Sequence, residues 1–268
     1  MRQRRKRGNS TSDYLLVILL VTFMALVIGA GLYWYSQKSP AVSKLNLCPV
    51  DGPRGRYVVL IDKTDPLTLN QKEALKSLLG NILEKAPTGY MISIFVLGEN
   101  FTQSTEPIVE RCNPGDPKNA SDVNSNRTRL RDKYEKQYLE PIMNSYISHL
   151  NDTKPGSTSP IFEMLQLISV KSFGNKGFGG EKRLFIISDM LHNTPQYSMF
   201  GVRLDFNAFA ATSYGLQQTA VQFENVHIEE YLLLFQPQIQ KTANFKTFWE
   251  AYFLKTNRAS YLSRPLGF

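Results

Sequence analysis

An uninterrupted apolar stretch near the N-terminus constrains this chain more than any other feature. Residues 14–35 (YLLVILLVTFMALVIGAGLYWY) are 22 positions without a charged side chain. As a helix rising about 1.5 Å per residue, they would extend roughly 33 Å, which is enough to cross the apolar core of a bilayer. Lipid offers no partner to backbone polar groups, so a spanning segment of this kind has to be helical. We therefore expect one transmembrane helix over residues 14–35.

The residues on either side of this segment predict its orientation. Residues 1–13 carry five basic residues and one Asp, and residues 33–35 are the aromatic run YWY. Basic flanks stay in the cytoplasm, and aromatic side chains favour the interface between lipid and water. We expect a cytoplasmic basic tail over residues 1–13 and a single-pass signal anchor. The rest of the chain would then be periplasmic or extracellular, with a bacterial inner membrane as the expected location.

A cleaved signal peptide is the alternative explanation of the same segment. Residues 28–30 (IGA) form a weak cleavage site. The apolar region of a signal peptide has about 7–15 residues, however, and this one is longer. The length favours an anchor that stays attached.

Charge and cysteine content exclude several classes of protein. The 31 Lys and Arg against 23 Asp and Glu give a net charge of +8, and the tail alone contributes +4. The remainder is only mildly basic, so we expect no nucleic-acid partner. Two cysteines are too few for a disulfide-rich scaffold or for a paired CxxC zinc site.

A βαβ pattern begins after a polar tether expected over residues 36–55. Residues 57–61 (YVVLI) and 91–97 (MISIFVL) are short apolar runs typical of buried parallel strands. Between them, Thr68 and Gln71 form a capping box, followed by leucines and isoleucines at helical spacing. Strand, helix and strand in succession predict an α/β domain over residues 56–268.

The rest of that domain continues the alternation of helices and strands. A Gly-rich run at 173–180 lacks the Gly-Lys-Ser/Thr of a phosphate-binding loop. A helix is expected after Pro160, capped by Ser159. The other expected elements are an edge strand at 106–112, a charged helix at 127–150, strands at 184–188 and 226–235, a helix at 206–221, and a last helix that buries Phe245, Phe248, Trp249, Tyr252 and Phe253. The fold class is a doubly wound, mostly parallel sheet.

Two of the expected strands end in aspartate, where such sheets bind ligands. Asp62 follows residues 57–61 and Asp189 follows 184–188, while a Gly-Ser-Thr-Ser loop precedes the intervening helix. With these motifs the chain resembles the von Willebrand factor type A (VWA) family. That family has a doubly wound fold and a metal-ion-dependent adhesion site, built from a DxSxS loop, a loop threonine and a later aspartate. The resemblance spans roughly residues 56–255, although only the three short motifs are specific.

The resemblance implies a Mg²⁺ site built from Asp62, Thr64, Thr158 and Asp189. Magnesium takes six oxygen ligands and keeps several waters, so hydroxyls and carboxylates suit it. Pro66 stands where the family has its second serine, and it supplies no side-chain oxygen. We therefore expect a degenerate site with no cofactor, and Mg²⁺ only if the site is functional. The alternative without any site is that the aspartates cap helices and Thr64 shapes a turn.

The resemblance also implies a function in protein binding. We expect a membrane-tethered interaction module, which is not an enzyme and whose partner is another envelope or secreted protein. The first alternative is a metal-assisted hydrolase using Asp62, Asp65 and Asp189. Against it, the three histidines are scattered, and no GxSxG motif is present. A second alternative is a purely structural subunit.

In the arrangement that the family implies, Cys48 and Cys112 would form a disulfide. The strand at 106–112 would run antiparallel beside 91–97 and end where the first strand starts. Cys48 lies about nine residues before that first strand, close enough to reach Cys112. Such a bond would hold the tether at the end of the sheet opposite Asp62 and Asp189, with the expected binding face directed away from the membrane. Two free, buried cysteines are the alternative.

The predicted orientation can be tested with a reporter fused after Phe268. Because the basic tail should stay in the cytoplasm, we expect a reporter that works only in the exported compartment to be active. The matched control is a reporter that works only in the cytoplasm, which should be silent at the same position. The reverse pattern would contradict the predicted topology.

Overall fold

The computed structural model describes residues 11–36, 42–99, 101–119, 127–150, 156–174, 180–255 and 259–266. They belong to two compact units, Met1–Ala41 and Val42–Phe268. Most of the expected basic tail and most of the Gly-rich run lie outside the described residues.

The first unit consists of helix α1 (Thr11–Ser36). Within the described residues, its segment Tyr14–Tyr35 is the one helix that is long and apolar enough to cross a membrane, judged by length and composition. The side chains of residues 14–35, the part of α1 whose burial is described, are all exposed, and the two core clusters of the second unit consist of that unit's own residues. The second unit therefore has a core of its own.

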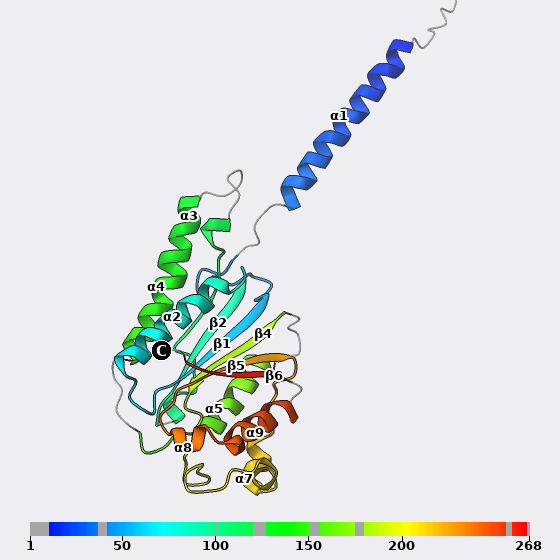
Figure 1. Cartoon of the computed structure of the whole chain (residues 1–268). Helices are drawn as coiled ribbons and strands as arrows, with labels where there is room; N and C mark the ends of the chain where they lie inside the picture. Colours follow the sequence, from blue (N-terminus) through cyan, green and yellow to red (C-terminus); the bar gives the residue numbers. More distant parts are fainter. Residues whose placement is uncertain are drawn as a thin grey trace, which may run out of the picture. The chain divides into compact units, whose positions relative to one another are not determined.

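The second unit is built on a six-stranded sheet in the order β3-β2-β1-β4-β5-β6 (Figure 1). All neighbouring strands pair in parallel except β2 and β3, which are antiparallel. The strands are β1 (Gly55–Asp62), β2 (Tyr90–Leu97), β3 (Val109–Cys112), β4 (Lys182–Ser188), β5 (Val226–Leu232) and β6 (Ser260–Pro265). This is the strand order of a doubly wound sheet, so the predicted fold class is confirmed.

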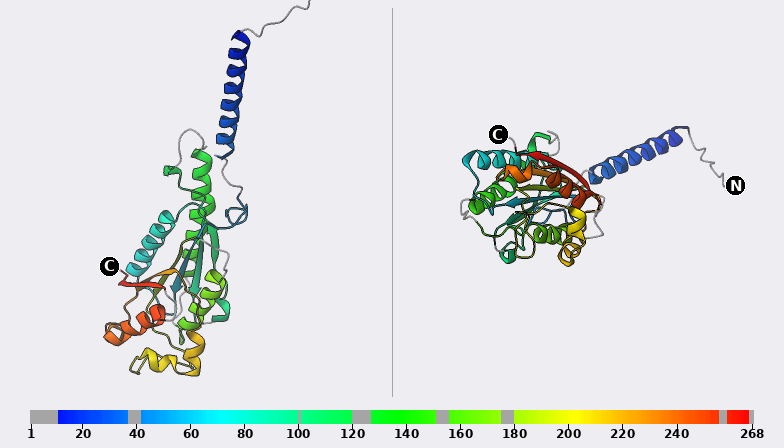
Figure 2. Two further views of the ribbon diagram at one scale, coloured as in Figure 1. Left: turned by 90° about the vertical axis from the view of Figure 1, so that its right-hand side faces the viewer. Right: turned by 60° about the horizontal axis from the view of Figure 1, so that its bottom comes forward.

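Two layers of helices cover the two faces of the sheet (Figure 2). On one face lie α2 (Leu69–Lys85) and the continuous helical run of α3 (Arg127–Asp132), the π-helical η3 (Lys133–Leu139) and α4 (Glu140–Leu150). The other face is covered mainly by α5 (Ile161–Ile168), η4 (Ser169–Phe173), α6 (Phe206–Ala210), α7 (Ser213–Gln218), α9 (Ala243–Glu250) and η5 (Ala251–Lys255). The short helices η1 (Phe101–Gln103), η2 (Pro117–Asn119) and α8 (Pro237–Gln240) lie in connections.

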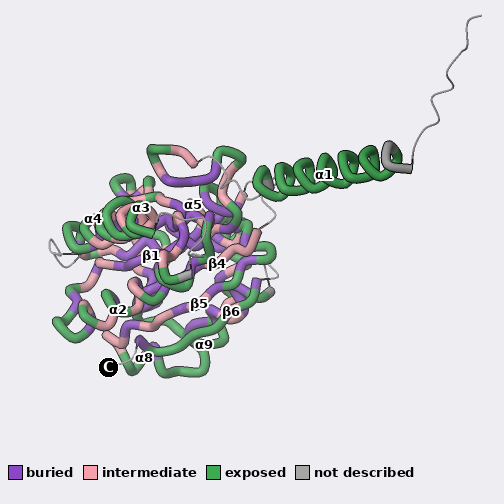
Figure 3. Tube along the Cα trace, turned by 90° about the horizontal axis from the view of Figure 1, so that it is seen from above, coloured by how far each residue is buried: buried purple, intermediate pink, exposed green. Residues whose placement is uncertain are grey.

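Alternation of side chains along β1 explains why the domain has a core on each face. Val58 and Leu60 belong to the cluster packed against α5 and α9, whereas Val59 and Ile61 belong to the cluster packed against α2 and α4. Successive side chains of a strand point to opposite faces. The central strands are accordingly buried, while the outer turns of the helices are exposed (Figure 3). The five aromatic residues expected in the core of the last helix are all buried.

Several elements differ from their predicted form. The helix expected over 206–221 is two helices, because Thr212 ends its regular pattern and caps α7 by accepting a hydrogen bond from the Gly215 amide. The charged helix at 127–150 is a run of three helical segments, α3, η3 and α4, and it buries Tyr138, Ile142 and Tyr146 against the sheet and α2. Strand β6 was not predicted.

The chain joins the domain earlier than the predicted tether suggests. Val42 pairs with Pro49, and the Ser43 amide donates to the Cys48 carbonyl at 2.8 Å. The Cys112 amide donates to the Asn46 carbonyl at 2.8 Å. Residues 42–49 therefore pack along the edge of β3 rather than serving as a free tether.

A disulfide joins Cys48 to Cys112 in the structure. Cys112 lies opposite Met91, at the start of β2. The three side chains form a small buried cluster of their own. The bond thus fastens the first residues of the domain to the end of the sheet where the parallel strands begin.

We expect mass spectrometry of unreduced, alkylated protein to recover the two cysteines in one cross-linked peptide pair. The bond closes a loop with a sequence separation of 64. In the chain-entropy description, losing such a cross-link lowers the free energy of unfolding by about 4 kcal/mol. The variant Cys48→Ser/Cys112→Ser should show that loss in urea unfolding. Two separately alkylated cysteines, or an unchanged free energy of unfolding, would contradict this account.

Candidate functional site

The adjacent parallel strands β1 and β4 finish at the same end of the sheet. Strand β1 ends in Asp62, and Asp189 directly follows the last residue of β4. Ile61 of β1 is opposite Ile187 of β4, so Asp62 and Ser188 follow side by side, with Asp189 next. The carboxyl ends of parallel strands are the usual place for ligand binding in such sheets. The structure thus brings together the two aspartates that the sequence places at strand ends.

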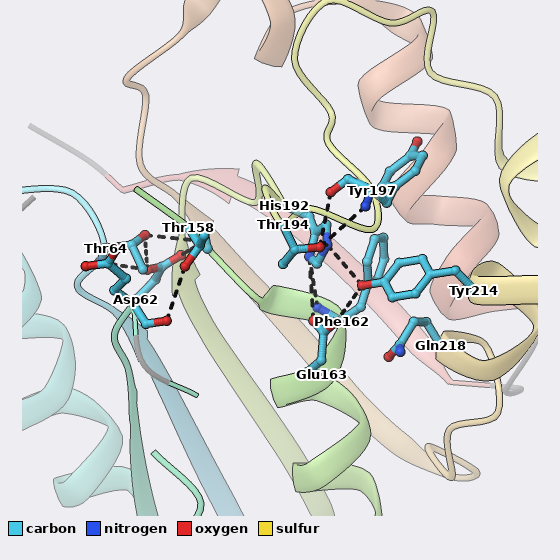
Figure 4. Close-up of polar contacts among 12 residues, drawn as sticks. Asp62, Thr64, Thr158, Phe162, Glu163, His192, Thr194, Tyr197, Tyr214 and Gln218 are labelled. Carbon is cyan, nitrogen blue, oxygen red and sulfur yellow. Dashed lines mark hydrogen bonds and ion pairs between the residues drawn. The ribbon is translucent and has the colours of Figure 1, made fainter. Parts of the chain in front are cut away.

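The carboxylate of Asp62 accepts hydrogen bonds from three separate segments (Figure 4). Its Oδ1 accepts from the Thr64 amide at 2.9 Å and from the Thr64 hydroxyl at 2.7 Å. Its Oδ2 accepts from the Ser188 hydroxyl at 2.8 Å and from the Ser159 hydroxyl at 3.4 Å. The side chain of Asp62 is buried, so it links the end of β1, the end of β4 and the loop before α5 inside the protein.

Thr158 does not take part in this cluster. Its hydroxyl donates to the Glu99 carbonyl at 3.2 Å, whereas the neighbouring Ser159 hydroxyl lies 3.3 Å from that of Thr64. Ser159 also does not cap α5, whose N-cap is Pro160 with no side-chain cap bond. The serine expected to cap the helix therefore occupies the place expected for Thr158.

Burial dominates the electrostatics of the aspartates. Loss of solvent raises the pKa of Asp62, although the hydrogen bonds from Thr64 and Ser188 act in the opposite direction. Burial, and then the charge of Asp62, raise the pKa of Asp189 well above its usual value. Burial also raises the pKa of the half-exposed Asp65. Carboxyl groups gathered in this way disfavour one another's charge.

The donor set at this site fits Mg²⁺ only in part. Hydroxyls of Thr64 and Ser159 and carboxylates of Asp62 and Asp189 are suitable oxygen donors. Each oxygen of Asp62 already accepts two hydrogen bonds, and the exposed Pro66 supplies no donor where a further hydroxyl is needed. In the part of the chain that the structure describes, no group of three or more His, Cys, Asp and Glu side chains is placed to hold a metal ion.

A second polar network, which sequence reasoning missed, lies beside the first. The Tyr214 hydroxyl donates to Glu163 at 2.6 Å and lies 3.0 Å from Nε2 of His192, and the Thr194 hydroxyl is 3.1 Å from the same nitrogen (Figure 4). Nδ1 of His192 accepts from the Phe162 amide at 3.4 Å, which leaves the proton on Nε2. Burial lowers the pKa of His192 to about 3, so its imidazole is neutral and makes no ion pair with Glu163 at 3.9 Å.

The loop over residues 189–205 connects these two networks. Asn193 exchanges backbone hydrogen bonds with Ser159 at 2.7 and 3.0 Å, and its side-chain amide donates to the Ser157 carbonyl at 3.0 Å. The Met199 amide donates to the His192 carbonyl at 3.0 Å. The loop is therefore fixed to the candidate site by its own backbone.

Strain in the backbone marks the first turn of this loop. Met190, directly after Asp189, has φ of 58°, a left-handed conformation that costs energy for a residue with a side chain. Two buried side chains hold the turn: Gln240 donates to the Asp189 carbonyl at 2.8 Å, and the Trp249 indole donates to the Met190 carbonyl at 3.2 Å. Helices α8 and α9 thus fix the backbone on which Asp189 sits.

Two solved structures are similar to this chain at low sequence identity. No family model matches the chain, and no curated protein matches it significantly. Among solved structures, the VWA domain of SpRpn10 is 12% identical, with 80% of this chain and 89% of that one covered at a TM-score of 0.39. Proximal thread matrix protein 1 from the mussel byssus is 14% identical, with 80% and 44% covered at a TM-score of 0.35.

For residues 42–268 that a chelator has first freed of metal, we expect added magnesium to leave the melting temperature unchanged. The reason is that Pro66 supplies no ligand and that both oxygens of Asp62 already accept hydrogen bonds, so the ligand set is incomplete. A site filled at 100 times its dissociation constant would add about 2.7 kcal/mol. For a domain of this size that is a rise of roughly 5–10 °C.

The variants Asp62→Asn and Asp51→Asn provide the control for this measurement. Asp51 is an exposed carboxyl in the segment before β1, away from the strand ends. A magnesium-dependent rise in melting temperature that Asp62→Asn abolishes and Asp51→Asn retains would show that the site does bind the metal.

Proposed function

We propose that the chain is a membrane-tethered module that binds another envelope or secreted protein through the loops at the carboxyl ends of β1 and β4. Helix α1 serves as the anchor, and Val42–Phe268 is the binding domain in the exported compartment. The adhesion-type metal site is degenerate, and the hydrogen bonds of Asp62 hold the binding loops in place of a metal ion. The domain binds its partner and performs no catalysis.

The loop over residues 189–205 is the observation that carries this proposal. It presents two exposed apolar side chains, Phe200 at 40% and Val202 at 51% exposure, beside the buried and well-bonded Met199 and His192. A loop that is already ordered loses little conformational freedom on binding, and exposed aromatic side chains are common in the centres of interfaces. Both properties favour a protein partner.

The described residues do not favour the alternative of a metal-assisted hydrolase using Asp62, Asp65 and Asp189. Such an enzyme needs a general base within reach of the reacting group. His149 bonds to Ser145 and Ser148, and His227 bonds to Ser260. His192 is buried, neutral and bonded to Tyr214 and Thr194. Each histidine side chain is thus hydrogen-bonded to a group other than these three aspartates.

Site-specific cross-linking tests the proposed binding loop. We expect a photoreactive amino acid in place of Phe200 to form a discrete adduct with one protein in intact membranes, because the partner covers this side chain. The matched control is the same amino acid in place of Val170, which is 58% exposed in η4, at the end of α5 away from the site. Adducts of equal yield at both positions, or none at position 200, would argue against this binding surface.

A further inference from the structure

A basic pocket lies at the start of α3, on the part of the domain opposite the candidate site. It has a volume of about 500 Å³ and is lined by Pro117, Lys118, Arg127, Arg131 and Glu135. Three cationic side chains therefore face one carboxylate. Lys118 also lies 3.0 Å from Glu84, but both side chains are largely exposed, and such surface pairs are weak.

The position of this pocket follows from the way α3, η3 and α4 pack against α2. The Tyr146 hydroxyl donates to the Lys72 carbonyl at 3.2 Å and the Tyr138 hydroxyl to the Leu83 carbonyl at 3.3 Å, so the two helical runs are antiparallel. Arg127 lies eleven positions before Tyr138, or roughly 16 Å farther along the axis. Helix α3 therefore extends past the end of α2, as Figure 2 also shows.

The chain enters the domain at this same end of the sheet. The Asn113 side chain donates to the Ala86 carbonyl just after α2, and Cys112 holds Cys48 through the disulfide. Val42 is six Cα–Cα steps from Ser36, the last residue of α1. Six steps span at most about 22 Å. If α1 crosses a membrane, this connection keeps the beginning of the domain within that distance of the lipid headgroups.

The dipole of the helical run does not favour a basic residue at the start of α3. Arg127 is the first residue of α3, and the first turn contains no acidic residue. Cations there oppose the helix dipole, whereas anions are favoured. Arg127 and Arg131 are four positions apart and share one side of the helix, facing the pocket. Guanidinium groups bind phosphate oxygens with two parallel hydrogen bonds, so paired arginines suit a phosphate group.

We propose that the pocket formed by Lys118, Arg127 and Arg131 binds the phosphate of an anionic phospholipid headgroup in the membrane that holds α1. This proposal rests on the membrane anchoring of the proposed function. A few basic residues bind an anionic surface weakly, since each adds about a five-fold preference. The short connection to α1 supplies a high effective concentration, which makes such a weak contact sufficient. The contact would hold the end of the domain at which the chain enters against the membrane. The loops at the other end of the sheet would stay free for a partner.

Limited proteolysis of the full chain in lipid nanodiscs tests this proposal. Trypsin cleavage after Arg129 is measured by mass spectrometry and normalised to cleavage after Arg203, an exposed residue of the loop at the other end of the sheet. We expect this ratio to fall about five-fold or more when phosphatidylcholine discs contain roughly 30% phosphatidylglycerol. High salt should remove the protection, because it screens exposed charges.

Two double variants with the same change in charge provide the controls. Arg127→Glu/Arg131→Glu should abolish the protection in anionic discs, while the cleavage site at Arg129 remains. Lys76→Glu/Lys241→Glu alters exposed residues away from the pocket and should keep the protection. Equal melting temperatures of the three proteins establish that all are folded.

The proposal is overturned by equal cleavage ratios in neutral and anionic discs, or by protection that persists in Arg127→Glu/Arg131→Glu. Inorganic phosphate giving the same protection in neutral discs would assign the pocket to free phosphate instead of lipid. A chain that fails to copurify with the discs would refute the membrane anchor itself. Copurification with equal ratios would refute the lipid contact alone, so the two failures are distinguishable.

Discussion

The carboxylate of Asp62 is the group on which the arrangement of the strand ends depends. It is buried between β1 and β4 and accepts four hydrogen bonds from Thr64, Ser159 and Ser188. Removing this carboxylate would leave its buried hydroxyl and amide donors without an acceptor. An unsatisfied buried donor costs more free energy than the net contribution of a single hydrogen bond. The loops after β1 and before α5 are thus fixed to the end of β4 as a unit. The long loop after β4 is attached to the same unit, because the backbone of Asn193 pairs with that of Ser159.

The neighbouring network shows how the rest of the domain supports these loops. The neutral imidazole of His192 accepts a hydrogen bond from the Phe162 amide and lies beside the Tyr214 hydroxyl, which donates to Glu163. Helices α5 and α7 and the loop over residues 189–205 are therefore joined by one chain of hydrogen bonds. Gln240 and Trp249 hold the strained turn at Met190. Strain held in this way, next to a buried acidic group, is typical of functional sites. At the opposite end of the sheet the disulfide fixes the point where the chain enters.

Most of the fold could be predicted because its central strands are short apolar runs with clear ends. Strand β6 was missed because it is an edge strand: Leu262, Ser263 and Arg264 are exposed, so they show no buried pattern. Within the site, Asp62 and Asp189 were found from their position after strands, and Thr64 from the resemblance of its loop to the DxSxS motif. Ser159 could not be distinguished from Thr158, because three consecutive hydroxyl residues precede the helix and only the backbone decides which one faces Asp62. A lone histidine such as His192 carries no sequence signal, since its partners come from distant segments.

Amide hydrogen exchange of residues 42–268 in the presence of a chelator tests most directly whether Asp62 holds the loops without a metal ion. The amides of Gly156, Ser159 and Asn193 are bonded to Thr64, Asn193 and Ser159 respectively, so each reports on one junction. We predict slow exchange at all three, unchanged by magnesium, and fast exchange in Asp62→Ala while the amides of β1 and β4 stay protected. Fast exchange in the wild-type protein that becomes slow only when magnesium is added would contradict the account.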